Sequence, residues 1–231
     1  MVRDAVQLKP ISAELSGEIE KVRQNIWRTI LRGFEIVTSA VPFLCVIATV
    51  VAQVLNTWHN PWQDPISSLV WGSYGAIQTA AFYLLGFAVL ILAFKLLPRS
   101  KSWLLRAGIA ALALTGLGMV LVGVFPAGRD GFPRTITDIL HTQISTVIML
   151  LFPAACFIMA PRIKDCFSRN WLSAYTWAAG ALGIILVFLQ AALVLPGHGW
   201  MGTIERFQVL NGIAWVQVVT FMTLKKTPAC R

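Results

Sequence analysis

Charged residues are scarce in this chain of 231 residues, where Asp, Glu, Lys and Arg together make up 13%. A soluble domain carries roughly 25%. Hydrophobic residues make up 57%, and the mean hydropathy is +0.70. This composition excludes an ordinary soluble domain, and a helix crosses a membrane with about 20 apolar residues. We therefore expect an all-α integral membrane protein, a six-transmembrane-helix bundle, with helices at 34–56, 72–97, 103–125, 138–160, 172–195 and 204–224.

Several familiar signals are also missing. The four cysteines form no CxxC pair, so neither a disulfide framework nor a cysteine zinc site is indicated. The motifs GxGxxG, HExxH and GxSxG and a Walker loop do not occur. No cleavable signal peptide is expected, because the first apolar stretch begins only after residue 30. We expect this stretch to stay in the membrane as an anchor.

Lys and Arg are almost absent from alternate segments between the apolar stretches. Arg129, Arg134 and Arg206 are the three of 19 that lie in the even-numbered segments. Lys and Arg favour cytoplasmic loops, which places both termini in the cytoplasm. The net charge of +9 does not indicate nucleic-acid binding, since the basic groups flank apolar stretches and form no continuous face. We expect some of them to touch anionic lipid headgroups.

Three regions follow from this topology. Residues 1–33 form a cytoplasmic N-terminal segment, 34–224 the six-helix transmembrane domain and 225–231 a cytoplasmic tail. Within 11–32, apolar residues recur at helical spacing, at Leu15, Ile19, Val22, Ile26 and Ile30. The pattern predicts an amphipathic helix on the cytoplasmic interface, or else a simple extension of the first span. The multi-pass protein belongs in a plasma or inner membrane.

Features within the spans predict close packing. Pro42 and Pro153 are expected to interrupt or kink the first and fourth spans. Small residues that let helix backbones approach one another recur in the third and fifth spans: Ala107, Ala111, Gly116, Gly118, Ala179, Gly180 and Gly183. Tryptophans gather near helix ends, as expected at a membrane–water interface: Trp58, Trp62, Trp71, Trp103, Trp171 and Trp200.

All three histidines lie on the side that Lys and Arg avoid, which is the extracytoplasmic side of this topology. The first polar cluster there contains Asp64 and Ser67. Asp64 followed by Pro65 predicts a helix start with Asp64 as N-cap. The alternative is functional, with a carboxylate and a hydroxyl at the mouth of the bundle.

The second cluster opens the fourth span, where Asp138, His141, Thr142 and Ser145 form one polar stripe. Ionisable side chains within a span usually face the bundle or a wet cavity. Asp138 is expected to hold the His141 ring in one tautomer, which leaves the other ring nitrogen for chemistry. The alternative is a hydrogen-bonded interface histidine without a function.

The third cluster opens the sixth span with Glu205, Arg206, Gln208 and Asn211. Glu205 and Arg206 form either a structural ion pair or a site for a polar headgroup, since arginine matches carboxylate and phosphate. Three helix N-termini gathered on one side carry partial positive charge. They suggest a pocket for anionic or strongly polar groups.

Four stretches carry a family resemblance: Asp64–Leu69 with Gly72, Gly123–Pro126, His141, and Gly202–Arg206. In this order, within residues 35–224, they resemble the integral-membrane family catalogued as domain of unknown function 998. In that family an acidic residue often follows the Phe-Pro pair closely. Here Ala127, Gly128 and Arg129 separate Pro126 from Asp130, so the chain departs from the pattern at this point. The resemblance implies the fold and no reaction, because the activity of the family is unknown.

Two main functions remain open, and the sequence leaves any cofactor unknown. The first is an enzyme acting on a lipid or amphipathic substrate. Its expected catalytic residues are Asp64, Ser67, His141 and Glu205, and its expected substrate-binding residues are Asp138, Ser145, Arg206, Gln208 and Asn211. His141 would act as a general base, or would bind zinc together with His59 or His198 in a spacing that matches no recognised metal pattern.

The second function is a non-catalytic accessory subunit of a membrane complex that binds partner helices, lipid or pigment. A transporter comes third, because the polar groups in the middle of the spans are few and neutral. Membrane lipids and another membrane protein are the expected partners.

Overall fold

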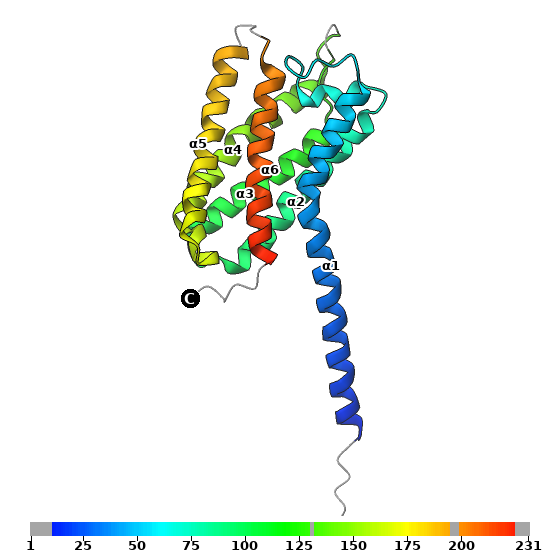
Figure 1. Cartoon of the computed structure of the whole chain (residues 1–231), viewed down its shortest axis with the longest axis vertical. Coiled ribbons are helices and arrows are strands. Elements are labelled where there is room, and N and C mark those ends of the chain that lie inside the picture. The colour runs from blue at the N-terminus through cyan, green and yellow to red at the C-terminus, as the bar shows by residue number, and fades with distance from the viewer. Residues whose placement is uncertain (1–10, 130–131, 195–198, 225–231) are drawn as a thin grey trace, which may run out of the picture. The chain divides into compact units, whose positions relative to one another are not determined.

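The computed structural model describes residues 11–129, 132–194 and 199–224, and the secondary structure in these ranges is entirely helical. This confirms the all-α class for the described part of the chain. The helices are α1 (Ile11–Leu55), the 3-10 helix η1 (Ile66–Trp71), α2 (Gly75–Leu96), the 3-10 helix η2 (Leu97–Arg99), α3 (Trp103–Val124), α4 (Ile136–Phe167), α5 (Asn170–Val194) and α6 (Met201–Leu224) (Figure 1).

The chain divides into two units, Met1–Thr38 and Ser39–Arg231, and α1 has residues in both. In the first unit the expected helix over 11–32 is present. Its apolar stripe is more than half exposed where side chains are described, at Ile19, Val22 and Ile26. The helix is therefore confirmed, and its position on the cytoplasmic interface remains a prediction.

Five helices are long and apolar enough to cross a membrane: Gly75–Arg99, Trp103–Val124, Ile136–Phe167, Asn170–Leu193 and Met201–Leu224. They support an integral multi-pass membrane protein. The remaining stretch, expected at 34–56, gives a shorter apolar helix over Ser39–Leu55 in the part of the chain that was described. Five of the six expected spans are thus supported, and the one expected at 34–56 remains a prediction.

The helices of the second unit follow one another around a ring. The helix α3 packs against α2 and α4, α4 packs against α5, and α5 packs against α6. The ring closes where α6 returns to α2 and η1, and Figure 1 shows α6 between α5 and α2. This order brings the start of α6 beside the start of α2, although about 125 residues separate them in the sequence.

Two apolar cores hold this ring together. The larger one contains fully buried side chains from four helices: Leu92, Leu112, Met159, Ile163, Trp215 and Val219. Trp215 also donates its indole N–H to the Thr176 hydroxyl at 3.1 Å, which joins α6 to α5. The smaller core lies against η1 and comprises Ala52, Ile66, Leu69, Phe82 and Val122. It supports the end of the bundle where α6 begins.

Small residues allow the helix backbones to approach, as the sequence predicts. A Cβ atom on Gly116 would lie 2.9 Å from the backbone oxygen of Gly86, and one on Gly86 would lie 2.7 Å from the backbone oxygen of Gly116. The helices α2 and α3 therefore meet backbone to backbone. Neither Pro42 nor Pro153 ends its helix, because α1 and α4 continue through both prolines. The expected interruption is therefore wrong, and the expected kink stays a prediction.

This contact predicts different outcomes for two glycine substitutions. Gly86→Ala pushes a methyl group into the α3 backbone, and overpacking of this kind costs about 1–3 kcal/mol. Gly212→Ala meets no atom closer than 4.0 Å and is expected to leave stability nearly unchanged. Thermal unfolding of both variants in the same detergent measures the difference. Equal melting temperatures for the two variants would contradict the close α2–α3 packing.

Candidate functional site

The N-terminus of α6 is closed by the segment that connects α1 to η1, residues 56–65, which we call the capping loop. The first amides of an α-helix have no partner within the helix. Here the Gly202 N–H donates to the Gln63 carbonyl at 3.1 Å, and the Thr203 N–H donates to the Trp62 carbonyl at 3.2 Å. The capping loop thus supplies the acceptors that α6 lacks.

Glu205 of α6 caps η1 in return. Its carboxylate accepts a hydrogen bond from the Ile66 N–H at 2.8 Å and another from the backbone of Ser67. The side chain is 8% exposed, so these charge-assisted bonds replace its lost hydration. The prediction that Asp64 caps this helix is wrong. The cap position belongs to Pro65, without a side-chain bond, and the acceptor comes from a residue 139 positions away.

Asp64 shapes the capping loop itself. Its Oδ2 accepts from the Asn60 N–H at 2.6 Å, and the Asn60 side-chain oxygen accepts from the Trp62 N–H at 3.0 Å. These local bonds between side chain and backbone are typical of Asx turns. They hold the Trp62 carbonyl, which α6 uses as a cap.

Arg206 ties the same parts together from the other side. Its Nη1 donates to the Asp64 carbonyl at 3.1 Å and to the Gly202 carbonyl at 2.8 Å, and its Nη2 donates to Gln53 Oε1 at 2.6 Å. Within the described residues Arg206 forms no ion pair with Glu205, and these donors bind Asp64 of the capping loop, Gly202 of α6 and Gln53 of α1. A Cβ at position 202 would collide with the Asp64 carbonyl oxygen, which explains the glycine there.

His59 belongs to the capping loop and is 4% exposed. Its Nε2 donates to the Pro65 carbonyl at 3.0 Å, since a carbonyl oxygen only accepts. Burial lowers the pKa of His59, and no described residue bonds to its Nδ1. The neutral ring is therefore a structural part of the loop.

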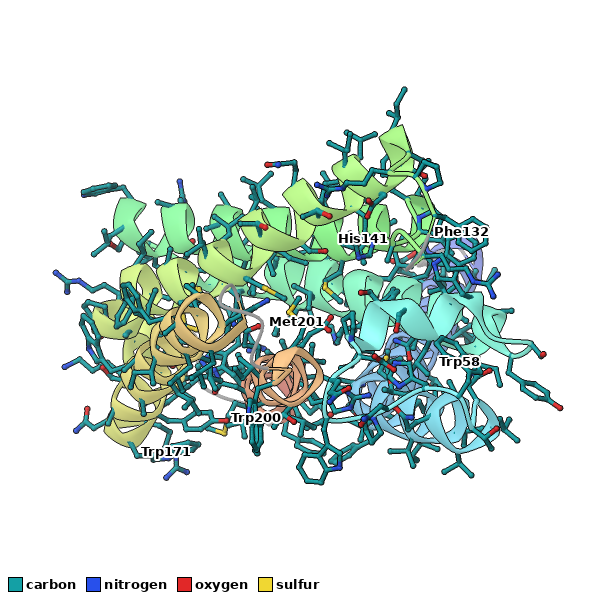
Figure 2. All side chains as sticks on the ribbon, turned by 90° about the horizontal axis from the view of Figure 1, so that it is seen from above. Trp58, Phe132, His141, Trp171, Trp200 and Met201 are labelled. Atoms are coloured by element: carbon teal, nitrogen blue, oxygen red, sulfur yellow. The ribbon has the colours of Figure 1, made fainter. Side chains whose placement is uncertain are left out.

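His141 is held by the end of α3. Its Nδ1 lies 2.7 Å from the Phe125 carbonyl oxygen, so Nδ1 carries the proton and Nε2 is the acceptor. The prediction that Asp138 orients this ring is wrong. Asp138 instead accepts from the Gly128 N–H at 2.9 Å and pairs with Arg134 at 3.0 Å. Figure 2, seen from above, shows His141 and Met201, where α6 begins, between Phe132 on one side and Trp200 on the other.

A cavity opens beneath these caps, and its volume is about 110 Å³. This is roughly ten times the space that one water molecule needs. Six of the nine expected site residues line it: Ser67, His141, Ser145, Glu205, Gln208 and Asn211. Asp64, Asp138 and Arg206 do not, and the bonds described above account for each of them.

The walls of the cavity are mostly apolar, whereas the sequence predicted only its polar residues. They include side chains from α2, α3, α4 and α6: Phe82, Leu85, Val89, Met119, Val122, Ile148, Met149, Phe152, Val209, Ile213 and Val216. Along α6 the lining runs from Glu205 to Val216, which at 1.5 Å per residue is about 16 Å. The cavity thus extends from the polar end toward the middle of the helices. These residues resemble any other core positions in the sequence, so no local signal marks them.

Gln208 brings an unsatisfied amide to this cavity. Both polar atoms of its side chain are buried and have no hydrogen-bond partner among the described residues. Its neighbour Asn211 donates Nδ2 to the Ala179 carbonyl at 2.9 Å. A buried amide without a partner costs free energy, so Gln208 is placed to bond with an occupant of the cavity.

No group of three or more His, Cys, Asp or Glu residues with the geometry to hold a metal ion occurs within residues 11–129, 132–194 and 199–224. His59 does not line the cavity with His141. His198, the other histidine considered for zinc, lies outside the described residues.

Comparison with known proteins gives one match. The model of a family described as "Protein of unknown function (DUF998)" matches residues 39–222. Neither the curated proteins nor the solved structures contain a match. The matched range includes the capping loop, η1 and every residue that lines the cavity.

The Glu205 cap predicts a difference between two substitutions. Glu205→Gln keeps an oxygen that accepts from Ile66 and is expected to retain most of the stability. Glu205→Leu leaves buried amides without an acceptor, which costs about 1–3 kcal/mol. Thermal unfolding of both purified variants in detergent measures this difference. A Leu variant as stable as the Gln variant would show that the cap is dispensable.

Proposed function

The chain belongs to the DUF998 family of proteins of unknown function, and we propose that it binds and acts on a lipid-like amphiphile in the cavity beside α6. The polar end of the ligand lies against Ser67, His141 and Glu205. Its apolar part follows the wall that α6 forms with α2, α3 and α4. The observation that carries this proposal is a cavity that is polar at one end and apolar along the rest of its length.

Charge supports an uncharged ligand. The cavity lining contains Glu205 and no Lys or Arg. The guanidinium of Arg206, the residue that follows Glu205, donates to two carbonyls and to Gln53. A phosphate would therefore meet a carboxylate without a compensating cation. A hydroxyl, ester or amide suits the same lining, because Gln208 offers both a donor and an acceptor.

His141 is the group in the cavity best suited to move a proton. The Phe125 carbonyl holds the Nδ1 proton, which leaves Nε2 as an acceptor for a ligand hydroxyl or a water molecule. Among the described hydrogen bonds, none joins Ser67 to His141. Ser67 therefore serves here as a partner for the ligand, and not as a nucleophile already paired with its base.

A non-catalytic accessory subunit of a membrane complex is the alternative. Its lipid or partner-helix surface would be apolar, and Ser39–Leu55 exposes such side chains at Phe43, Ile47, Val50 and Val54. Lipid profiles of cells carrying His141→Gln separate the two functions. An enzyme predicts accumulation of its substrate, whereas an unchanged profile, with the bound amphiphile retained, favours the accessory subunit.

The topology that accompanies this proposal has six spans and cytoplasmic termini. Ser39–Leu55 crosses the membrane together with residues before it, and the helix over 11–32 lies on the cytoplasmic interface. The connections that follow α2 and α4 carry Lys and Arg and face the cytoplasm, and the cavity opens on the other side. The protein resides in a plasma or inner membrane, and nucleic acid is not a partner.

Two amides of α6 allow a matched test of ligand binding. Gln208 and Gln217 are both buried without hydrogen-bond partners, but only Gln208 lines the cavity. Gln208→Leu is expected to weaken retention of a co-purified amphiphile about fivefold, the equivalent of one hydrogen bond. Gln217→Leu should leave retention unchanged. Native mass spectrometry in mild detergent measures it, and an equal loss in both variants, or no bound amphiphile in the wild type, would overturn the proposal.

Single cysteines test the topology in intact cells with a membrane-impermeant maleimide, in a Cys230→Ser background. Arg134→Cys is expected to react from outside, and Lys101→Cys only after permeabilisation. Gly17→Cys decides whether Ser39–Leu55 crosses the membrane. If Gly17→Cys is protected to the same extent as Lys101→Cys, the protein has six spans. If Gly17→Cys is labelled from outside, the protein has five spans.

A further inference from the structure

The opposite end of the bundle carries a second hollow, with a volume of about 630 Å³. Two connections form it: the one from η2 into α3, and the one from the end of α4 into α5. Its lining residues are mostly polar or charged: Arg99, Lys101, Ser102, Arg162, Lys164, Asp165, Ser168 and Asn170, with Leu105 at its base. It is separate from the cavity beside α6, with which it shares no residue.

The charge of this hollow is strongly positive. Four of its lining residues are cationic, and the acidic member is Asp165, which lies 3.8 Å from Arg162. Arg99 is fixed in place, because its Nη2 donates to the Thr223 carbonyl at 3.2 Å and its guanidinium lies over the Phe167 ring. Lys101 and Lys164 form no ion pair with any described residue. Two ammonium groups thus remain for an anion.

The start of α3 adds donors to the hollow. The side chain of its N-cap residue, Ser102, makes no capping bond. At the end of α4, the Ser168 N–H donates to the Lys164 carbonyl at 2.7 Å, so that carbonyl is already used. The N–H groups at the start of α3 and the Ser102 hydroxyl suit anion oxygens.

The position of the hollow matches the depth of a phosphate group in a membrane. It lies where four membrane-spanning helices end or begin, at Arg99, Trp103, Phe167 and Asn170. Trp103 and Trp171 flank it and are 78% and 50% exposed. Tryptophan side chains of this kind mark the interface between hydrocarbon and water.

We propose that this hollow binds a phosphate-type anion, with Lys101, Lys164 and Arg162 as its cationic partners and the Ser102 hydroxyl as a further donor. Both the phosphate of an anionic lipid headgroup and a soluble phosphate compound have the required chemistry. The site is independent of the amphiphile proposed for the other end.

The test uses the full-length protein in mild detergent, with phosphatidic acid, phosphatidylcholine and inorganic phosphate as probes. Native mass spectrometry measures lipid retention, and thermal unfolding measures stabilisation by phosphate. The double variant Lys101→Gln/Lys164→Gln is expected to retain phosphatidic acid about tenfold less well, because two charge-assisted bonds are lost. Phosphatidylcholine should bind weakly to every variant.

The matched control is Arg129→Gln/Arg134→Gln, which removes the same net charge at two residues of the second unit that do not line the hollow. It should retain phosphatidic acid as the wild type does. Asp165→Asn removes the acidic lining residue and is expected to strengthen retention, so the two sets of variants move in opposite directions. A loss of folding cannot produce that pattern.

The outcomes separate the two sources of phosphate. Stabilisation by phosphatidic acid alone identifies a lipid headgroup site, and stabilisation by inorganic phosphate as well identifies a site for soluble phosphate compounds. Equal retention by both double variants, or no response of the wild type to either probe, would overturn the proposal.

Discussion

The polar end of this bundle depends on the need to satisfy buried backbone amides. Helix ends near the hydrocarbon of a membrane cannot rely on water for their free N–H groups. The starts of α6 and η1 meet this need reciprocally: carbonyls of the capping loop accept from α6, while Glu205 of α6 accepts from η1. Arg206 adds bonds from α6 to Asp64 and Gln53. The position of the capping loop, and with it the roof of the cavity, follows from this exchange.

The same exchange determines the chemistry of the cavity. Arg206 and Asp64 are the charged groups that would have suited an ionic headgroup, and the exchange uses both of them. The cavity keeps Glu205, the free nitrogen of His141 and the unpartnered amide of Gln208. The two ends of the bundle thus differ in kind. One offers mostly neutral hydrogen-bonding groups above an apolar cavity, and the other offers a hollow lined by four cationic side chains.

The stretches that carry the family resemblance take part in this arrangement. The Glu205 carboxylate caps the Ile66 amide, and the Asp64 and Gly202 carbonyls accept from Arg206. The Phe125 carbonyl fixes the His141 ring. The sequence predicted that these residues gather at one end, since each follows or opens an apolar span. It assigned Asp64 and Asp138 the wrong bonds, because each has several possible partners nearby in the sequence and spacing does not decide among them. The acceptor for η1 is 139 residues from its donor, and no local spacing reveals such a pair.

The sequence by itself determined the membrane class, the helices and the segregation of Lys and Arg, because apolar length and loop charge act locally along the chain. It also narrowed the candidate site to nine residues, six of which line one cavity. The tertiary structure alone decided the order of helices around the ring and the apolar walls from Phe82 to Val216. It also decided which polar side chains are used in capping and which face the cavity. These features depend on contacts between segments that are distant in the sequence. No single stretch of sequence shows which distant segment it will contact.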